Sequence, residues 1–573
     1  MKQQANNIKI LFLTGCILIS TIAVVLVVAS LCFMVNITIA SWQFPVSFVL
    51  TGILYFYLAK DYYGTVSIFL KSFLFCFGII LLSILIALCF YDLSYDGQTY
   101  HMETIVLLKN GWNPFKTLLP QKNYLYLYIN HYPRAVELPQ STIYSLIGRI
   151  EATKSINFVL LTATFCLCLS YLLGLNKLSN LKCILLSFVA TFNPVAVNQL
   201  ISTYVDGQMA LLFLSFFIAS LYVLKKSSST NLILLGSIIV ITANIKFTSL
   251  VYICIFAFAF AVWILFTRNK QLIRRTFLGL GLSGFISIFI VGFHPYVINT
   301  VDFKHPFYPL MGSKKMDIIT VNIPKGLQHK NAAGKFFTSL FAHTDNLMND
   351  NERDVELKIP FTFNKIDIVS APKIDARVAG FGPMFSGILL LSVVLFIVSF
   401  FFPGDTRVLR GFSYFIFVIA FSVFIMPDSW WARYVPQLWF LPVGILLGFE
   451  LYSRTGKAGI LKFMIYAALT INIGFTFIGF GWNFIMSRLV DYQLEKLKAS
   501  RQPVEVQWDI CSTNYVRFQE NGIKFIEKDL KDRKDVELIV RSNSLFVVDP
   551  NVDIPKSNFI KWAEKYQQPA AKQ

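Results

Sequence analysis

The apolar run SFLFCFGIILLSILIALCF (Ser72–Phe90) passes directly into the polar segment YDLSYDGQTYHMETIVLLKNGWN (Tyr91–Asn113). A helix needs about 20 apolar residues to cross the hydrocarbon core of a bilayer, so the first segment has the length of a membrane span. The second segment opens the first long polar stretch of the chain. It places several chemically active side chains close together, namely Asp92, Asp96, Tyr100, His101 and Glu103.

The composition extends this pattern to the whole chain. Of 573 residues, 55% are hydrophobic and 14% are charged, whereas about a quarter of the residues in a soluble domain are charged. The repeated apolar runs predict an α-helical polytopic membrane protein with about 13 transmembrane helices. The expected spans are 10–33, 42–59, 72–90, 155–174, 183–200, 207–224, 231–244, 248–266, 276–296, 381–402, 411–426, 436–453 and 459–482.

Lysine and arginine gather in every second short loop between these spans, for example Lys177 and Lys182, then Arg407 and Arg410. Basic short loops are typical of the cytoplasmic side. We therefore expect a multi-pass protein of the cytoplasmic (inner) membrane, with its N-terminus in the cytoplasm and its C-terminus outside. The net charge of +19 then indicates orientation and contact with membrane lipids, and no nucleic acid is expected as a partner.

The same alternation places three long polar segments outside: 91–154, 297–380 and 483–573. We divide the chain into two extra N-terminal helices (1–67), a main transmembrane region (68–482) and a C-terminal extracytoplasmic domain (483–573).

Local patterns predict how these outer segments fold. Thr99–Lys109 is expected to form an amphipathic helix that lays Ile105, Val106 and Leu108 on lipid. Proline-bounded aromatic clusters predict a structured loop in 297–380. In the tail, strand-like runs such as Val504–Trp508 predict a small α/β domain.

Asp96 is the leading catalytic candidate. Asp96 and Tyr100 are four residues apart and share one face of a helix, and His101 and Glu103 follow at once. A partly desolvated carboxylate at a membrane surface can act as general base toward a hydroxyl or an amine. Two alternatives stay open: Asp96 is an ordinary solvated residue beside a span, or Asp92, one helical turn earlier, takes its role.

Two basic residues are placed to hold an anion. Lys246 interrupts a long apolar stretch in ITANIKFTSL, and a charge at membrane depth usually faces a cavity or a partner. Arg433 lies beside Tyr434 in the outer turn PDSWWARYVP, where a guanidinium fork suits phosphate. Snorkelling toward the membrane surface explains either residue equally well. Asp206, at the outer start of a span, is a weaker candidate.

The sequence lacks the motifs that several membrane activities require. The sequence has no GxxxxGK[ST] phosphate loop and no HExxH zinc motif, which argues against an ATP-driven pump and a zinc protease. Its nine cysteines show no metal-ligand spacing. The absence of an internal repeat weakens a secondary-transporter interpretation.

The order of these features resembles the GT-C superfamily of integral-membrane glycosyltransferases, which includes the protein O-mannosyltransferase and aminoarabinose-transferase-like families of bacteria. The similarity covers residues 68–450, and HPFYPLMG and GFGPMF resemble an uncharacterised bacterial branch. The chain departs from the mannosyltransferases in two ways: Asp96 is followed by Gly instead of a second acid, and two spans precede the usual first helix. The matching pieces are SYDGQTYH (Ser94–His101), NIKFT (Asn244–Thr248) and WARYVP (Trp431–Pro436).

The resemblance implies a sugar donor carried on polyprenyl phosphate, with Asp96 as catalytic base and Lys246 and Arg433 at the donor phosphate. Tyr100, His101 and Tyr434 are expected to contact the sugar or the phosphate. The acceptor is a cell-envelope glycan, a lipid or a protein. No metal ligand is assigned, although a divalent ion (Mg²⁺ or Mn²⁺) at Asp96 and Glu103 stays open.

Two other classes of function also stay open. One is an envelope polysaccharide polymerase or ligase, which would depend more on outer arginines than on Asp96. The other is a non-enzymatic lipid or polysaccharide transporter, which would need no general base.

Overall fold

The computed structural model describes residues 2–63, 66–313, 315–348, 353–375, 377–452, 458–547, 549, 552 and 554–565, and most of them lie in helices. The α-helices are α1 (Lys2–Met34), α2 (Gln43–Tyr63), α3 (Val66–Leu88), α4 (Met102–Lys109), α5 (Leu125–His131), α6 (Glu137–Ile147), α7 (Ser155–Gly174), α8 (Asn180–Thr191), α9 (Pro194–Gln199), α10 (Asp206–Lys225), α11 (Ser229–Ala243), α12 (Phe247–Phe266), α13 (Lys270–Phe285), α14 (Ile298–Phe303), α15 (Lys325–Gln328), α16 (Ala332–Leu340), α17 (Lys365–Ser370), α18 (Phe385–Ser399), α19 (Thr406–Phe424), α20 (Phe440–Tyr452), α21 (Gly459–Lys498), α22 (Asn514–Glu520) and α23 (Asn558–Glu564). The strands are β1 (Val504–Gln507), β2 (Phe525–Glu527), β3 (Val536–Leu538) and β4 (Leu545–Val547). Shorter π and 3-10 turns are η1 (Gly97–His101), η2 (Ile150–Lys154), η3 (Ile286–Val291), η4 (Phe293–Val297), η5 (Thr320–Asn322), η6 (Ala432–Tyr434) and η7 (Pro436–Trp439).

Eight helices in the described part of the chain are long and apolar enough to cross a membrane. They are α1, α3, α7 with η2, α10, α12, α13 with η3, α19 and α21. Four further apolar helices, α2, α8, α11 and α18, are shorter by this measure. The architecture is that of a polytopic membrane protein, and the expected count of about 13 full spans is wrong.

The lower count reflects helices that are shorter than a full span and, in one apolar run, a break. The expected span 183–200 is two helices, because α8 ends at Thr191 and the side chain of Asn193 caps α9, which begins at Pro194. Proline suits the first turn of a helix and not its interior. A hydropathy window does not detect this break, because the flanking residues stay apolar. The break at Asn244–Lys246, which separates α11 from α12, was expected because Lys246 interrupts the apolar stretch.

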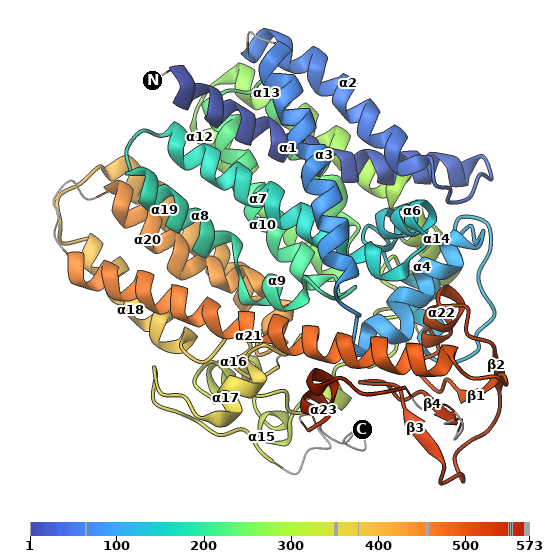
Figure 1. Ribbon diagram of the computed structural model, residues 1–573. Coiled ribbons are helices and arrows are strands. Elements are labelled where there is room, and N and C mark those ends of the chain that lie inside the picture. The colour runs from blue at the N-terminus through green and yellow to red at the C-terminus, as the bar shows by residue number, and fades with distance from the viewer. Residues whose placement is uncertain are drawn as a thin grey trace.

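Helix α1 crosses the upper part of the bundle between α2 and α7 in the view of Figure 1. It packs against α2, α3, α7 and α11, and its side chains Leu13, Ile17 and Phe33 are fully buried. Buried apolar surface on several faces is what a central helix requires. Helix α1 is therefore part of the bundle core and not an appendage to it.

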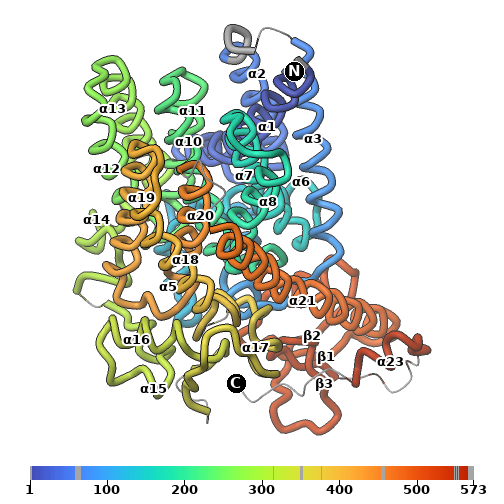
Figure 2. Tube along the Cα trace, turned by 90° about the vertical axis from the view of Figure 1, so that its left-hand side faces the viewer, coloured from blue at the N-terminus to red at the C-terminus, as the bar shows by residue number. Residues whose placement is uncertain are grey.

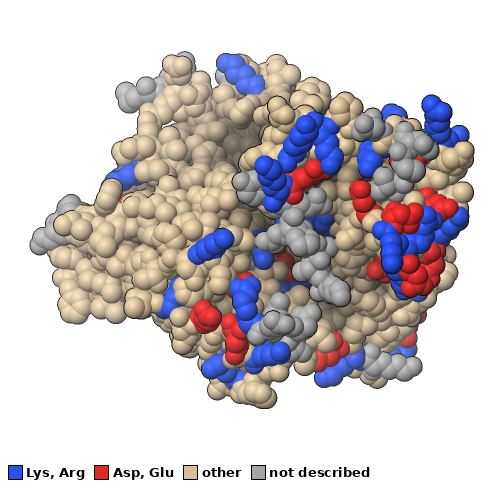
Figure 3. Space-filling model, turned by 60° about the horizontal axis from the view of Figure 1, so that its bottom comes forward, with Lys and Arg blue, Asp and Glu red and all other residues tan. Residues whose placement is uncertain are grey.

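The polar parts of the chain gather at one end of the molecule. The C-terminal sheet and helices α15–α17 lie along the lower edge of Figures 1 and 2, whereas the N-terminus lies at the upper edge. Figure 3 shows this end turned toward the viewer, with Lys, Arg, Asp and Glu clustered beside a broad area that carries hardly any charge. We call it the polar end.

The C-terminal residues form the small α/β domain that the sequence indicated. Its sheet has the order β2-β1-β4-β3, with β1 parallel to β2 and the other neighbours antiparallel. Helix α21 is 40 residues long and continues through position 483 into this domain. Its last turns, including Val490 and Leu494, share an apolar core with Val506 and Phe546 of the sheet.

The first polar segment folds back into the protein and does not lie on lipid. Ile105, Val106 and Leu108 of α4 are all buried, because α6 packs along α4 and Val516 of α22 joins the same apolar cluster. The expectation that these three side chains contact lipid is therefore wrong, although the helix itself is present.

Candidate active site

A cavity of about 1880 Å³ lies at the polar end of the bundle. Its walls come from the segment that carries Asp96, the start of α12, the loops between α14 and α18, and the turn before η7. Residues of α21 and of the C-terminal domain complete the lining. The volume exceeds the roughly 300–1,000 Å³ of a usual small-molecule pocket, so the cavity has room for two ligands.

Asp96 lies at the start of η1, where the chain turns from α3 into the first polar segment. Single π-helical turns are frequent at functional sites. A Cβ atom at Gly97 would overlap the carboxylate of Asp92 and the hydroxyl of Ser94, so this tight turn requires glycine. The Asp96 carboxylate makes no capping bond to η1 and instead accepts a hydrogen bond from Arg433, with Nη1 and Oδ2 3.1 Å apart.

Arg433 joins three carboxylates from three different parts of the chain. Its Nη1 also lies 3.9 Å from Oδ2 of Asp206, and its Nε lies 3.4 Å from Oδ1 of Asp375. The guanidinium stacks 4.4 Å from the ring centroid of Trp431. Among the described residues, Nη2 of Arg433 has no hydrogen-bond partner.

Lys246 begins the turn into α12 and faces the same cluster. Its ammonium donates to Oδ1 of Asp206 across 2.9 Å and lies 4.1 Å from the ring centroid of Tyr434. Asp206 is the first residue of α10, where the helix dipole favours a carboxylate. Lys246 therefore faces a partner and the cavity and does not snorkel to the membrane surface.

Asp375 is the third carboxylate of the cluster. It accepts a hydrogen bond from Nε1 of Trp431 at 3.1 Å and pairs with Nη2 of Arg377, also at 3.1 Å. Burial raises its pKa in spite of these cations. Burial alone would lower the pKa of Arg433, but the carboxylates of Asp375, Asp96 and Asp206 outweigh it and raise that pKa. Arg433 therefore stays cationic, while Asp375 takes up a proton more readily than a solvated aspartate.

Tyrosine rings form one wall of the cavity beside this cluster. The ring centroids of Tyr100 and Tyr128 lie 5.4 Å apart, and those of Tyr128 and Tyr132 lie 5.1 Å apart. Burial raises the pKa of Tyr100, Tyr132 and Tyr204, so their phenols remain hydrogen-bond donors. An aromatic wall with polar edges suits a sugar ring or an apolar chain.

Asp92 does not reach the cavity and serves the fold instead. Its side chain is fully buried and accepts four hydrogen bonds. Ser94 donates from its backbone nitrogen at 2.9 Å and from Oγ at 2.5 Å. Thr203 donates from its backbone nitrogen and from Oγ1, each at 2.7 Å. A carboxylate with these partners is not free to take a substrate proton, so the alternative role of Asp92 as base is wrong.

His101 and Glu103 are also buried away from the cavity. Nδ1 of His101 bonds Oε1 of Glu137 at 2.7 Å, and Glu103 accepts from the phenol of Tyr126 at 3.3 Å. His101 therefore does not reach the cavity in which a substrate would bind. Glu103 does not join Asp96, and the described residues contain no group of three His, Cys, Asp or Glu side chains arranged to hold a metal.

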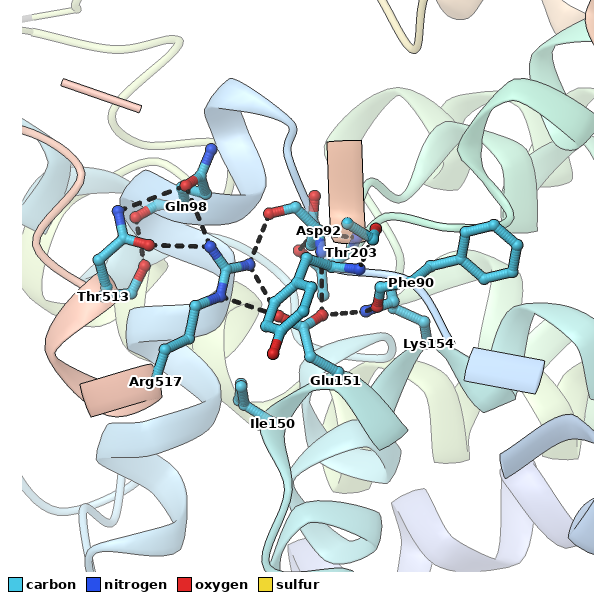
Figure 4. A network of polar contacts seen from close by, with 12 residues as sticks. Phe90, Asp92, Gln98, Ile150, Glu151, Lys154, Thr203, Thr513 and Arg517 are labelled. Carbon is cyan, nitrogen blue, oxygen red and sulfur yellow. Dashed lines mark hydrogen bonds and ion pairs between the residues drawn. The ribbon is translucent and has the colours of Figure 1, made fainter. Parts of the chain in front are cut away.

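The C-terminal domain makes hydrogen bonds and ion pairs that hold the segment carrying Asp96 (Figure 4). Arg517 of α22 is buried and donates to Oε1 of Glu151 from Nε at 2.9 Å and from Nη2 at 2.7 Å. The same Nη2 donates to the carbonyl of Asp92 at 2.7 Å. Lys154 adds a second cation to Glu151 and bonds the carbonyl of Phe90 at 2.9 Å.

Gln98, two residues after Asp96, makes a second set of hydrogen bonds to the C-terminal domain. Its side-chain Nε2 donates to the backbone carbonyl of Arg541 at 2.9 Å, and its backbone carbonyl accepts from the hydroxyl of Thr513. Residues before and after Asp96 are thus both bonded to the C-terminal domain. The domain is well placed to hold the orientation of the Asp96 carboxylate.

Of the residues predicted from the sequence, the structure brings together Asp96, Lys246, Arg433, Tyr434 and Asp206 and places Tyr100 on the same cavity wall. It also adds Asp375 and Arg517, which the sequence analysis did not select. The sequence signal for Asp375 was weak: it stands two positions before Arg377, near the end of the polar segment 297–380. Comparison with protein-family models gave no match, and no curated protein or solved structure matched the chain.

Proposed function

We propose that this chain is a membrane glycosyltransferase of the GT-C kind, which moves a sugar from polyprenyl phosphate to an acceptor at the outer face of the cytoplasmic membrane. One observation carries the proposal. A carboxylate, Asp96, and two cations, Lys246 and Arg433, converge on one large cavity at the polar end of a membrane bundle. A base and an anion holder side by side are what transfer from a lipid phosphate requires.

In this proposal Lys246 and Arg433 bind the phosphate of the donor. The ammonium of Lys246 has three N–H groups and gives one to Asp206, while Nη2 of Arg433 is free among the described residues. Asp206 and Asp375 hold both cations in place. As the bond to the sugar breaks, negative charge grows on the phosphate, and preorganised cations stabilise that charge most in the transition state.

Asp96 acts as the general base. The acceptor hydroxyl or amine gives its proton to the Asp96 carboxylate and attacks the anomeric carbon from the face opposite the phosphate. The bond from that carbon to the phosphate oxygen breaks, and its electron pair stays on polyprenyl phosphate. Attack from the opposite face inverts the anomeric configuration. The hydrogen bond from Arg433 orients the Asp96 carboxylate.

The tyrosine wall takes the sugar. Tyr100 and Tyr434 line the cavity next to the cationic pair and present a ring face with a polar edge. His101 acts through Tyr100, since their ring centroids lie 4.2 Å apart. No step is assigned to a metal, because the Arg433 guanidinium itself occupies the centre of the carboxylate cluster.

The experiment that tests the proposal is donor turnover. Purified full-length protein is incubated with a panel of polyprenyl-phosphate sugars and crude envelope acceptor, and released polyprenyl phosphate is followed by mass spectrometry. We expect release with one sugar class, dependent on acceptor. Absence of release across the panel, with acceptor fractions from the native envelope, would contradict the proposal and favour a polymerase or a transporter.

A further inference from the structure

The formal charges of the cluster around Arg433 cancel before any ligand binds. The cluster consists of three cations and three carboxylates, namely Lys246, Arg377, Arg433, Asp96, Asp206 and Asp375. A phosphate brings further negative charge into this neutral cluster. Because charges interact strongly in a partly desolvated site, binding is favoured when one carboxylate moves away or takes up a proton.

The hydrogen bonds of Arg433 show where the phosphate meets a carboxylate. Nη1 faces Asp96 at 3.1 Å and Asp206 at 3.9 Å. Nε lies 3.4 Å from Oδ1 of Asp375, but among the described residues neither Nε nor Nη2 makes a hydrogen bond. Nε and Nη2 share one edge of the planar guanidinium. An anion that binds Nη2 therefore lies beside the carboxylate of Asp375.

The carboxylate of Asp375 is fixed by two buried side chains. Nε1 of Trp431 donates to Oδ1 and Nη2 of Arg377 donates to Oδ2, each at 3.1 Å. Trp431 is 1% exposed and Arg377 is 6% exposed. Arg377 is itself held by Oδ1 of Asn322 at 2.8 Å and stacks 4.2 Å from the ring centroid of Trp431. Asp375 is therefore not free to swing away, and proton uptake is the remaining way to remove its charge.

Asp375 is also the carboxylate of the cluster that is both open to the cavity and free of another duty. It lines the cavity, and 17% of its side chain is exposed. Asp206 is 2% exposed and holds the ammonium of Lys246 at 2.9 Å. Asp96 has to stay ionised to act as the general base of the proposed function. A proton taken up at Asp375 leaves both of these roles intact.

The surroundings of Asp375 favour its neutral form. The titratable and charged groups that face it are Arg377 on its own segment, Arg433 of η6, Asp96 before η1, Asp206 of α10 and Tyr204 before α10. Burial raises the pKa of Asp375 and outweighs the two cations, and the two other carboxylates add to the rise. A phosphate beside Asp375 is one more negative charge and favours the neutral acid further.

We propose that Asp375 is a ligand of the donor phosphate, which takes up one proton when the phosphate binds at Arg433 and donates it in a hydrogen bond to a phosphate oxygen. The proton comes from solvent and returns to solvent when the phosphate leaves. This role rests on the proposed function, which supplies the phosphate. The hydrogen bond gains strength as the sugar departs, because negative charge then grows on the phosphate.

The first test measures proton uptake on binding without turnover. Full-length protein in nanodiscs of neutral phosphatidylcholine is titrated with farnesyl methyl phosphate, a phosphodiester that has no titratable proton near neutral pH. Calorimetry at pH 6.5 in two amine buffers of different ionisation enthalpy gives the number of protons taken up. We expect about one proton per bound probe, and an affinity that falls by up to about tenfold per pH unit between pH 6 and 8. Absence of probe binding, or binding without proton uptake, would overturn the proposal.

Three variants assign the proton to its residue. Asp375→Asn should bind the probe without proton uptake and with the same affinity at pH 6 and pH 8, whereas Asp375→Glu keeps an acid and should restore the uptake. Asp428→Asn is the matched control, since Asp428 lines the same cavity and burial raises its pKa as well, and it should take up protons as the wild type does. Unfolding temperatures check that each variant is folded. Uptake that persists in folded Asp375→Asn, or that is lost in Asp428→Asn alone, would overturn the assignment.

The second test links the proton to the donor. In turnover, the KM for donor should rise by about tenfold or more from pH 6 to 8 in the wild type and stay within twofold in Asp375→Asn, with the KM for acceptor equal in the two proteins. A pH-dependent KM for acceptor that the variant abolishes would show that Asp375 binds the acceptor instead, which would overturn the proposal. If no donor is turned over at all, the proposed function fails, whereas the probe titration still decides whether Asp375 takes up a proton with a phosphate.

Discussion

Nη1 of Arg433 donates to Oδ2 of Asp96 across 3.1 Å, although the two residues are 337 positions apart in the chain. The contact joins the first polar segment to the turn before the last two helices of the bundle. It places the proposed base and the proposed phosphate holder within one hydrogen bond of each other. Substitutions at the two positions should therefore not have additive effects.

Arg433→Lys should lower turnover even though it keeps the positive charge. A lysine ammonium cannot match the planar fork that reaches Asp96, Asp206 and Asp375 from Nη1 and Nε. Loss of one preorganised contact to a transition-state anion costs about 10²–10³ in kcat. The measurement is kcat for released polyprenyl phosphate. Arg533→Lys, at an exposed site of the C-terminal domain, is the matched control, and equal kcat in the two variants would contradict the role of Arg433.

Arg517→Leu should uncouple the C-terminal domain from the segment that carries Asp96. The substitution leaves Glu151 with Lys154 as its remaining cation and the Asp92 carbonyl without its donor. Removal of one partner of a buried ion pair costs about 3–5 kcal/mol. We expect a lower unfolding temperature, faster proteolysis of the C-terminal domain and reduced kcat, although Arg517 does not line the cavity. Wild-type proteolysis and kcat together would show that the domain does not position Asp96.

Glu520→Gln should stabilise the protein in a pH-dependent way. Burial raises the pKa of Glu520 from 4.5 to about 7, at a site where Glu520 accepts from the backbone of Ile150 at 2.8 Å. The folded state therefore binds the proton more tightly than the unfolded state, and stability from this group is lost as pH rises from 4.5 through 7. The variant escapes this loss, which amounts to at most about 3 kcal/mol.

The measurement is the difference in unfolding temperature between Glu520→Gln and wild type at pH 4.5, 6, 7 and 8. The difference should be near zero at pH 4.5 and largest at pH 8. Glu537→Gln, at an exposed strand position, should show no such trend. A difference that does not change with pH would contradict a raised pKa at Glu520.

A cysteine introduced at Lys534 tests the expected orientation. Position 534 is exposed in the C-terminal domain, and of the nine native cysteines Cys89 and Cys254 are exposed, so both are replaced by serine. A membrane-impermeant maleimide should label the new thiol in intact cells. Labelling only after permeabilisation would place the C-terminal domain and the cavity on the cytoplasmic side.

The sequence predicted the helical membrane class and the C-terminal α/β domain because both depend on local patterns. Apolar length identifies membrane helices, and alternating apolar residues identify strands such as Val504–Gln507. The number of full spans could not be predicted from apolar length alone. The break at Asn193–Pro194 leaves hydropathy nearly unchanged, yet it divides one apolar run into α8 and α9.

The site was predictable where polar residues interrupt apolar surroundings, as Asp96, Lys246 and Arg433 do. It was not predictable where the partner is set by tertiary packing. Asp375 meets Arg433 across 58 positions, and Arg517 meets Glu151 across 366 positions, so no spacing rule connects them. His101 was misplaced because its partner Glu137 lies 36 positions further along the chain, and tertiary packing brings the two together.

Donor turnover by Asp96→Asn tests the central claim most directly. The variant keeps the size and shape of the side chain but cannot take the acceptor proton. Asp317→Asn is the control, since Asp317 lines the same cavity and, among the described residues, its carboxylate accepts hydrogen bonds from its own turn. We predict that Asp96→Asn retains the wild-type unfolding temperature and loses release of polyprenyl phosphate by about 10²-fold or more, while Asp317→Asn stays near wild type. Wild-type release by a folded Asp96→Asn protein would contradict Asp96 as the catalytic base.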